Sequence, residues 1–199
     1  MSIRGCDANQ DLSNHATCLA KAGFTFACRY YKSSPSCLSK AEAMALSAAG
    51  LYVVTIVENG SPTSAGYFSH AKGLSDGMFA IKSALFVGQT SGSPIYFAVD
   101  HDASQSEVLG VITDYFAGIA TAFAKTGNAH PIGVYGSGLV CSHIKKSIPG
   151  SYAWLSMSTG WTGSHTFADW NLKQTVGSTV CGVSIDEDIS QGHGGGWKI

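Results

Sequence analysis

The stretch IYFAVDHDAS, residues 95–104, begins as an uncharged hydrophobic run and ends in two aspartates, Asp100 and Asp102. Pro94 precedes the run, and Ser104 with Glu107 forms an S-x-x-E capping box that predicts a helix directly after it. A strand that leads into a helix is typical of a parallel sheet, whose strands are joined by crossover helices. This stretch therefore predicts an α/β fold.

The same alternation extends along the chain. Further helices are predicted from Ser13 to Ala22, after Ser39, from Asp76 to Val87 and after Ser137. Eight apolar runs are candidate strands: 3–7, 24–31, 51–58, 95–100, 131–136, 152–158, 167–174 and 181–190. Eight strands favour a closed (β/α)8 TIM-like barrel over an open doubly wound sheet. Because such barrels typically use about 250 residues and this chain has 199, we expect a modified barrel with short or missing helices in its C-terminal half.

The sequence shows no repeat, linker or break in composition that would divide it. We expect one domain over residues 1–192, followed by a frayed, glycine-rich tail over residues 193–199.

The composition argues against several kinds of partner. The formal net charge is -1 and the longest basic run is Lys145-Lys146, so no nucleic acid or anionic membrane is expected to bind. No stretch of about 20 uncharged apolar residues is present, which predicts no membrane insertion. The first ten residues, MSIRGCDANQ, lack an apolar signal region, so we expect synthesis in the cytoplasm without a signal peptide. We further expect a monomer without metal or cofactor.

The six cysteines are widely spaced and form no Cys-x-x-Cys pair. Without a signal sequence, buried free thiols are favoured over disulfides. Disulfides remain the alternative if the protein works outside the cell.

Acidic residues recur where the predicted strands end: Asp7, Glu58, Asp100, Asp102 and Asp186. The carboxyl ends of parallel strands gather at one rim of a barrel, where active sites lie. Because side chains alternate along a strand, Asp100 and Asp102 share one face and are expected to look into the barrel mouth. Clustered carboxylates raise each other's pKa, and a protonated acid beside an ionised one is typical of glycosidic-bond cleavage.

Each residue also has a structural interpretation. Asp102 could cap the helix that follows it, and Glu58 precedes the turn signal Asn59-Gly60, which favours a structural over a catalytic role. Asp186 begins an acidic triplet that is typical of a solvated loop. Aromatic residues near the strand ends could stack on sugar rings or fill the core instead.

The ordered set GCDAN, FACRYY, AGLYVVTIVENG, PIYFAVDHDAS, PIGVYGSG, AWLSMSTGW and GVSIDEDIS, with a glutamine ending FADWNLKQ, covers nearly the whole chain. It resembles the glycoside-hydrolase-like domain catalogued as domain of unknown function 1906, a family similar to the family-25 lysozymes, which are muramidases. The resemblance implies a modified (β/α)8 barrel that acts on bacterial cell-wall polysaccharide. Asp7, Asp100 and Asp186 match acids of the lysozymes. Asp102 replaces the glutamate that is their proposed proton donor.

We therefore hypothesise a peptidoglycan-degrading glycosidase, such as an endolysin or a delivered antibacterial enzyme that reaches the cell wall after release. Asp102 would be the general acid, Asp100 the nucleophile or stabiliser, and Asp7 and Asp186 would hold charge and position. The candidate glycan contacts are Glu58, Tyr31, Tyr96, Tyr135, Trp154 and Gln174. Because aspartate is one methylene shorter than glutamate, the alternative is a catalytically inactive glycan-binding barrel.

Overall fold

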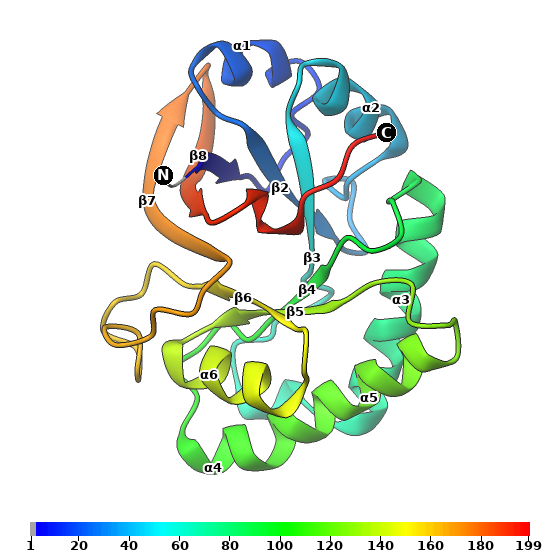
Figure 1. The fold of residues 1–199 in the computed structure, drawn as a ribbon, viewed down its shortest axis with the longest axis vertical. Coiled ribbons are helices and arrows are strands. Elements are labelled where there is room, and N and C mark those ends of the chain that lie inside the picture. Colours follow the sequence, from blue (N-terminus) through cyan, green and yellow to red (C-terminus); the bar gives the residue numbers. More distant parts are fainter. Residues whose placement is uncertain (1–2) are drawn as a thin grey trace.

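Eight strands close into a barrel in which each strand pairs with its neighbours in sequence and β8 pairs back with β1 (Figure 1). The computed structural model describes residues 3–199. The strands are β1 (Ile3–Asp7), β2 (Phe26–Tyr31), β3 (Tyr52–Val57), β4 (Ile95–Ala98), β5 (Ile132–Gly136), β6 (Tyr152–Leu155), β7 (Leu172–Val180) and β8 (Val183–Ser190). The predicted closed α/β barrel is confirmed, with β1 to β6 and β8 close to their expected places and β7 displaced toward the C-terminus.

The helices thin out toward the C-terminus, as the chain length predicted. They are α1 (Ala16–Lys21), α2 (Lys40–Ala48), η1 (Ala65–Tyr67), α3 (His70–Val87), α4 (Gln105–Glu107), η2 (Val108–Ile112), α5 (Thr113–Ala124), α6 (Gly138–Ser147) and η3 (His193–Gly195). Within the described residues, only the single turn η3 is helical after α6. The capping box of Ser104 and Glu107 is formed, and helix α3 starts six residues earlier than expected, where the Ser69 side chain caps it.

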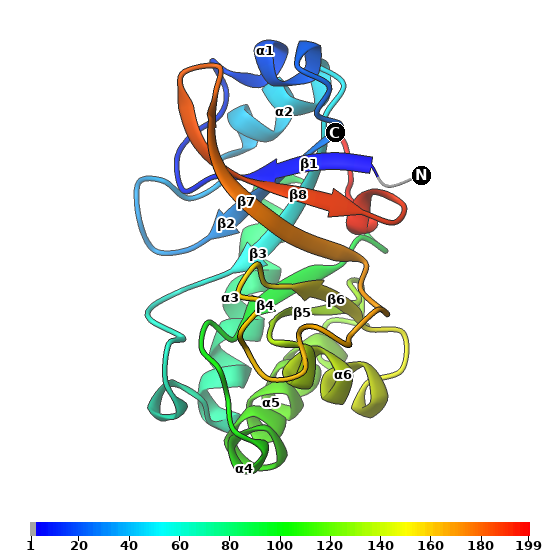
Figure 2. The same cartoon turned by 90° about the vertical axis from the view of Figure 1, so that its left-hand side faces the viewer.

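The last two strands depart from a regular (β/α)8 barrel. Strands β7 and β8 form an antiparallel hairpin, and β8 also runs antiparallel to β1 (Figure 2). The hairpin turns at Cys181 and Gly182, which have φ of 57° and 76°, as a two-residue turn between twisted strands requires. The expectation that all strands are parallel is therefore wrong for β8, and β7 begins at Leu172 rather than at Phe167.

Two apolar layers fill the domain, one inside the barrel and one between the barrel and its helices. The inner layer consists of Phe26, Cys28, Val54, Ile56, Tyr96, Ala98, Trp154 and Leu172. Glycines make room for its rings, because a Cβ at Gly5 would lie 2.2 Å from the ring of Phe26 and one at Gly133 would lie 2.5 Å from that of Tyr96. The inner layer fills the barrel, so a site formed by side chains at the carboxyl ends of the strands lies on top of this layer.

The helical stretch Gln105–Ala124 is long and apolar enough to cross a membrane by length and composition alone. Core helices share these properties, and here Tyr115 and Phe116 are buried, each in edge-to-face contact with Phe97 of β4. The stretch Gln105–Ala124 is therefore a core helix.

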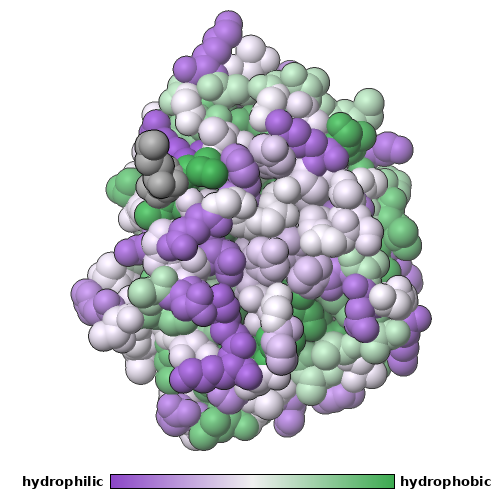
Figure 3. All heavy atoms as spheres, in the orientation of Figure 1, coloured by the Kyte–Doolittle hydropathy of each residue, from purple (hydrophilic) through white to green (hydrophobic). Residues whose placement is uncertain are grey.

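The face shown in Figure 3 carries separate hydrophobic areas among hydrophilic and intermediate residues.

The glycine-rich tail is packed, so the expectation that residues 193–199 form a frayed end is wrong. Trp197 is buried and exchanges two backbone hydrogen bonds with Val53, of 2.8 and 2.9 Å. Gly194 accepts a hydrogen bond of 2.9 Å from the Tyr96 hydroxyl. The tail closes the barrel at the end opposite to the carboxyl ends of β1 to β6, and residues 193–199 belong to the same folded unit.

A disulfide joins Cys18 of α1 to Cys181 at the tip of the β7–β8 hairpin, with Cα atoms 6.0 Å apart. The expectation of free thiols is thus wrong for this pair and right for Cys6, Cys28, Cys37 and Cys141. Only the folded hairpin brings the two cysteines together, because 163 residues separate them along the chain.

Replacing Cys18 with Ser is expected to lower the free energy of unfolding by about 2–5 kcal/mol, because the bridge closes a long loop in the unfolded chain. Denaturant titration with and without reductant measures this difference. The matched control is Cys37→Ser, which removes a free, half-buried thiol and should change stability by less than about 1 kcal/mol. An unfolding midpoint that reductant leaves unchanged in the wild type would contradict the prediction.

Candidate active site

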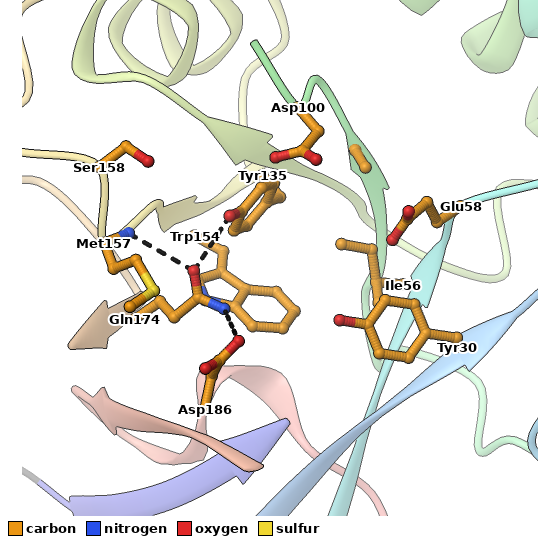
Figure 4. Close-up of a pocket in the computed structure, with 11 residues that line it drawn as sticks. Tyr30, Ile56, Glu58, Asp100, Tyr135, Trp154, Met157, Ser158, Gln174 and Asp186 are labelled. Carbon is orange, nitrogen blue, oxygen red and sulfur yellow. Dashed lines mark hydrogen bonds between the residues drawn. The ribbon is translucent and has the colours of Figure 1, made fainter. Parts of the chain in front are cut away.

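A pocket of about 310 Å³ opens at the carboxyl ends of the barrel strands (Figure 4). Its lining residues come from the seven strands β2 to β8 and from the segments just after β3, β4 and β6: Tyr30, Ile56, Glu58, Ala98, Asp100, Tyr135, Trp154, Met157, Ser158, Gln174 and Asp186. Asp100 and Asp186 lie on opposite sides of this pocket, and Glu58 points into it from the end of β3. Side chains that are remote in sequence thus meet because the barrel closes.

A second pocket of about 380 Å³ continues the first along β1 and β8. It is lined by Asp7, Ala8, Asn9, Gln10, Tyr30, Glu58, Ser184, Ile185 and Asp186. Tyr30, Glu58 and Asp186 line both pockets, so we treat the two as one groove and call it the acidic groove. An extended groove of this kind suits a chain-like ligand.

Asp7 is the centre of a hydrogen-bond network in this groove. Its carboxylate accepts hydrogen bonds from the Tyr30 hydroxyl at 2.7 Å and from Nε2 of Gln174 at 2.8 Å. The same Nε2 lies 3.3 Å from Oδ2 of Asp186, and the Tyr135 hydroxyl donates to Oε1 of Gln174 at 3.0 Å. Tyr135 therefore orients the Gln174 amide so that its NH2 group faces two carboxylates.

Burial raises the pKa of Asp7 to about 6, and the nearby charge of Asp186 acts in the same direction. The hydrogen bonds from Tyr30 and Gln174 oppose this shift by stabilising the ionised form. Asp7 is only 3% exposed. It can therefore exchange a proton slightly below neutral pH while both of its oxygens are already occupied by donors.

Asp100 and Glu58 are half-buried, and within residues 3–199 neither carboxyl group has a hydrogen-bond or ion-pair partner. Burial is the main cause that raises the pKa of each. The charge of Asp100 raises the pKa of Glu58 further, whereas Lys32 lowers it. These two groups are free to contact a ligand, and burial favours their protonated forms.

Asp188 is a buried acid that the sequence interpretation passed over. It is 0% exposed, its Oδ1 accepts a hydrogen bond of 2.9 Å from Nε1 of Trp154, and its Oδ2 has no partner among the described residues. Burial and the charge of Asp7 raise its pKa well above the ordinary value. Strand alternation was the signal that could have found it, because Asp186 and Asp188 share one face of β8.

The family comparison agrees with this geometry. The family model described as "Rv2525c-like, glycoside hydrolase-like domain" matches residues 17–193. The chain belongs to this family. The suspected resemblance to a glycoside-hydrolase-like domain is thereby confirmed.

Solved structures place the Rv2525c-like domain among known folds. It superposes on the Tat-secreted protein Rv2525c of Mycobacterium tuberculosis, crystallised with L-tartrate, with a TM-score of 0.82 and 21% identity over 98% of both chains. A muramidase from Trichobolus zukalii has the same fold, with a TM-score of 0.63 and 14% identity over 96% of this chain and 94% of that one. At these identities the likeness shows the fold alone.

A longer relative carries a similar segment. The uncharacterised protein YbfG of Bacillus subtilis is 35% identical over 161 residues, which are 74% of this chain and 22% of YbfG. The Rv2525c-like domain therefore spans about a fifth of this relative's length.

Seven of the residues singled out from the sequence line the acidic groove of this Rv2525c-like domain: Asp7, Glu58, Asp100, Tyr135, Trp154, Gln174 and Asp186. Asp186 was expected at the carboxyl end of a parallel strand. It lies instead within the antiparallel strand β8, directly opposite Asp7 of β1. Met157 and Ser158 also line the groove and were missed as site residues, whereas Tyr30 lines it as one of the aromatic residues near strand ends that could stack on sugar rings. Alternation in β2 could have indicated Tyr30, whereas nothing in the sequence places the loop that carries Met157.

Tyr31 and Tyr96 do not line the groove of the Rv2525c-like domain. Tyr31 points out of the barrel, where its hydroxyl donates to Oε1 of Gln89 at 2.7 Å. Tyr96 points inward but lies deep in the barrel and bonds to Gly194 of the tail. The prediction that they contact a glycan failed because one faces the helices and the other lies below the groove.

Asp102 is not among the residues that line the groove either. Strand β4 ends at Ala98, so the alternation that was expected to align Asp102 with Asp100 stops before it reaches Asp102. The Asp102 side chain is exposed, and its Oδ1 accepts a hydrogen bond of 2.7 Å from the backbone N–H of Thr162. Its position fits a residue that secures the loop after β6, in place of the expected general acid.

Proposed function

We propose that this domain is a glycoside hydrolase that cleaves the glycan of bacterial peptidoglycan in the acidic groove. The observation that carries the proposal is the placement of carboxyl groups on both sides of one groove, with Asp100 across from Asp186 (Figure 4). Glycosidases use such a pair, in which one acid protonates the leaving oxygen and a second carboxylate acts from the other side. Family membership and the fold shared with a muramidase support the same class of reaction.

In this proposal Asp100 is the general acid. It points into the pocket, it is half-buried, and no donor in residues 3–199 holds it ionised. Asp186 acts from the opposite side as nucleophile or as stabiliser of developing positive charge. Asp7, Gln174 and Tyr30 are positioning residues, because their hydrogen bonds hold the Asp186 side of the groove in place.

The disulfide agrees with action outside the cytoplasm. Disulfides form and persist mainly in oxidising compartments, and the relative Rv2525c is a Tat-secreted protein. Peptidoglycan lies in such a compartment. Release as an endolysin or delivery as an antibacterial enzyme would each bring the domain to this substrate.

The second candidate function is a glycan-binding module without activity. The position of Asp102 favours it, because the acid that the family resemblance matches to the proposed proton donor of the lysozymes does not line the groove. Incubating purified protein with bacterial cell walls and measuring new reducing ends separates the two functions. Binding without new reducing ends from pH 4 to 8 would leave the module as the function.

Activity is expected to be highest on the acid side of neutrality. Asp100 must be protonated to donate, and burial raises its pKa, so the active form persists to higher pH than for an exposed aspartate. As pH rises through that pKa the acid is lost and the rate should fall. Initial rates on purified cell walls across this range check the prediction, and a rate that climbs steadily above pH 7 would contradict it.

A further inference from the structure

The acidic groove concentrates negative charge in a protein that is almost neutral. Its lining includes Asp7, Glu58, Asp100 and Asp186, and residues 3–199 contribute no Lys, Arg or His side chain to it. The whole chain has a net charge of only -1, with 13 acidic and 12 basic residues. The charge of the groove is therefore local, and it attracts cationic ligands and repels anionic ones.

Asp100 and Glu58 have open hydrogen-bonding capacity as well as charge. Ionised carboxylates only accept hydrogen bonds, and these two find no donor within the described part of the chain. Their mutual repulsion raises the pKa of Glu58. A ligand that supplied both N–H donors and positive charge would relieve both the missing hydrogen bonds and the repulsion.

The ammonium group of Lys32 lies beside Tyr30, at the edge of the groove. Nζ of Lys32 contacts Oδ1 of Asn9 and lies 5.0 Å from the ring centroid of Tyr30, which lines both halves of the groove. Its charge also favours the ionised form of Glu58. An alkylammonium group is thus compatible with the aromatic and acidic surfaces found here.

We propose that the groove selects glycan chains with free amino groups, that is, hexosamine units that have lost their N-acetyl groups. This inference rests on the proposed function, because it names the substrate class of the groove to which glycan cleavage was assigned. A free ammonium group supplies three donors and a positive charge to Glu58 and leaves Asp100 able to keep its proton, whereas an N-acetyl group supplies one neutral N–H. Chains with free carboxylates, such as unsubstituted lactyl groups, are repelled.

Binding to two defined oligosaccharides of equal length tests the inference without requiring cleavage. The probes are β-1,4-linked glucosamine and N-acetylglucosamine oligomers, titrated into the wild-type protein by calorimetry at pH 6.5. We expect about tenfold tighter binding of the glucosamine oligomer at low salt, the size expected for contact between partly exposed opposite charges. The advantage should shrink as salt is added, because salt screens exposed charges.

Three variants test the origin of the preference. Glu58→Gln removes an acid from the groove and should lower the ratio of the two affinities several-fold. Lys32→Gln removes the competing ammonium and should raise that ratio. Asp114→Asn is the matched control for Glu58→Gln, because Asp114 is an exposed acid on α5 outside the groove, and it should leave the ratio unchanged.

The outcomes distinguish this inference from the proposed function. Equal affinities at low salt, or a ratio that Glu58→Gln does not change, would overturn the inference. Cleavage of fully N-acetylated cell walls at the same rate as of N-deacetylated ones would also overturn it and would leave the hydrolase proposal standing. A clear preference for glucosamine without any cleavage would support the inference and reject the hydrolase proposal.

Discussion

Replacing Asp100 with Asn is expected to reduce the release of reducing ends from peptidoglycan by a factor of about 10²–10⁴, the usual contribution of a general acid. Asparagine has nearly the shape of aspartic acid but cannot donate the proton that the leaving oxygen needs. The side chain is half-buried at the end of β4 and has no hydrogen-bond partner among residues 3–199, so the fold should tolerate the change. Initial rates on purified cell walls, with circular dichroism and thermal unfolding of both proteins, measure the effect.

The matched control is Asp102→Asn, the same chemical change two residues away. Asn keeps an oxygen that can accept the hydrogen bond from Thr162, and the side chain lies outside the groove. We expect less than a threefold change in rate, within the range of an effect transmitted through the loop. If Asp102→Asn abolished cleavage while Asp100→Asn left it intact, the assignment of the general acid made from the structure would be wrong.

Removing either partner of the buried ion pair between Arg29 and Glu42 is expected to lower the free energy of unfolding by about 3–5 kcal/mol. Both side chains are fully buried, and Nε of Arg29 lies 2.5 Å from Oε1 of Glu42. Arg29 also donates to the carbonyl groups of Ala8 and Ser36, and Glu42 accepts from the backbone N–H of Leu12 at 2.8 Å. Glu42→Gln or Arg29→Met would leave a buried charge and several polar groups without partners.

The consequence should reach the groove, because the pair anchors the segment after β1 that lines it at Ala8, Asn9 and Gln10. Denaturant unfolding measures the stability of each single variant and of the double variant Arg29→Met/Glu42→Leu. The double variant should lose less than the sum of the singles, since no isolated charge remains. The control is Asp169→Asn, which breaks an exposed ion pair with Lys145 and should change stability by less than about 1 kcal/mol.

Local signals predicted much of the fold. Helices start after Ser39 and Ser104 as predicted. The Ser104 start has a complete capping box, whereas at Ser39 only the serine side chain accepts a hydrogen bond, from the backbone N–H of Glu42, because the Glu42 side chain pairs with Arg29. Apolar runs located β1 to β6 and β8 and overlapped only the start of β7. These features depend on neighbours in the chain, so the sequence carries them directly. The acids Asp7, Glu58 and Asp100 at strand ends belong to the same class of prediction, because a parallel strand sends its carboxyl end to a known rim.

Predictions failed where a local rule was extended past its range. Alternation placed Asp102 beside Asp100, but it holds only while the strand continues, and β4 ends at Ala98. Tyr31 was chosen because it lies at a strand end, yet its neighbour Tyr30 faces the groove. A shift of one residue along a strand exchanges the inside and the outside of a barrel, and no neighbouring residue in the sequence reveals which set faces inward.

By itself, the sequence determined which segments are strands and helices, that the chain forms an α/β barrel, and that acids gather at strand ends. Only the tertiary structure decided that β8 pairs with β1, which brings Asp186 opposite Asp7 and Asp188 into the interior. It also decided the disulfide between Cys18 and Cys181 and the burial of the tail. The physical reason is that these pairings join residues more than a hundred positions apart. Their energy arises only when the barrel closes, so no local pattern records it.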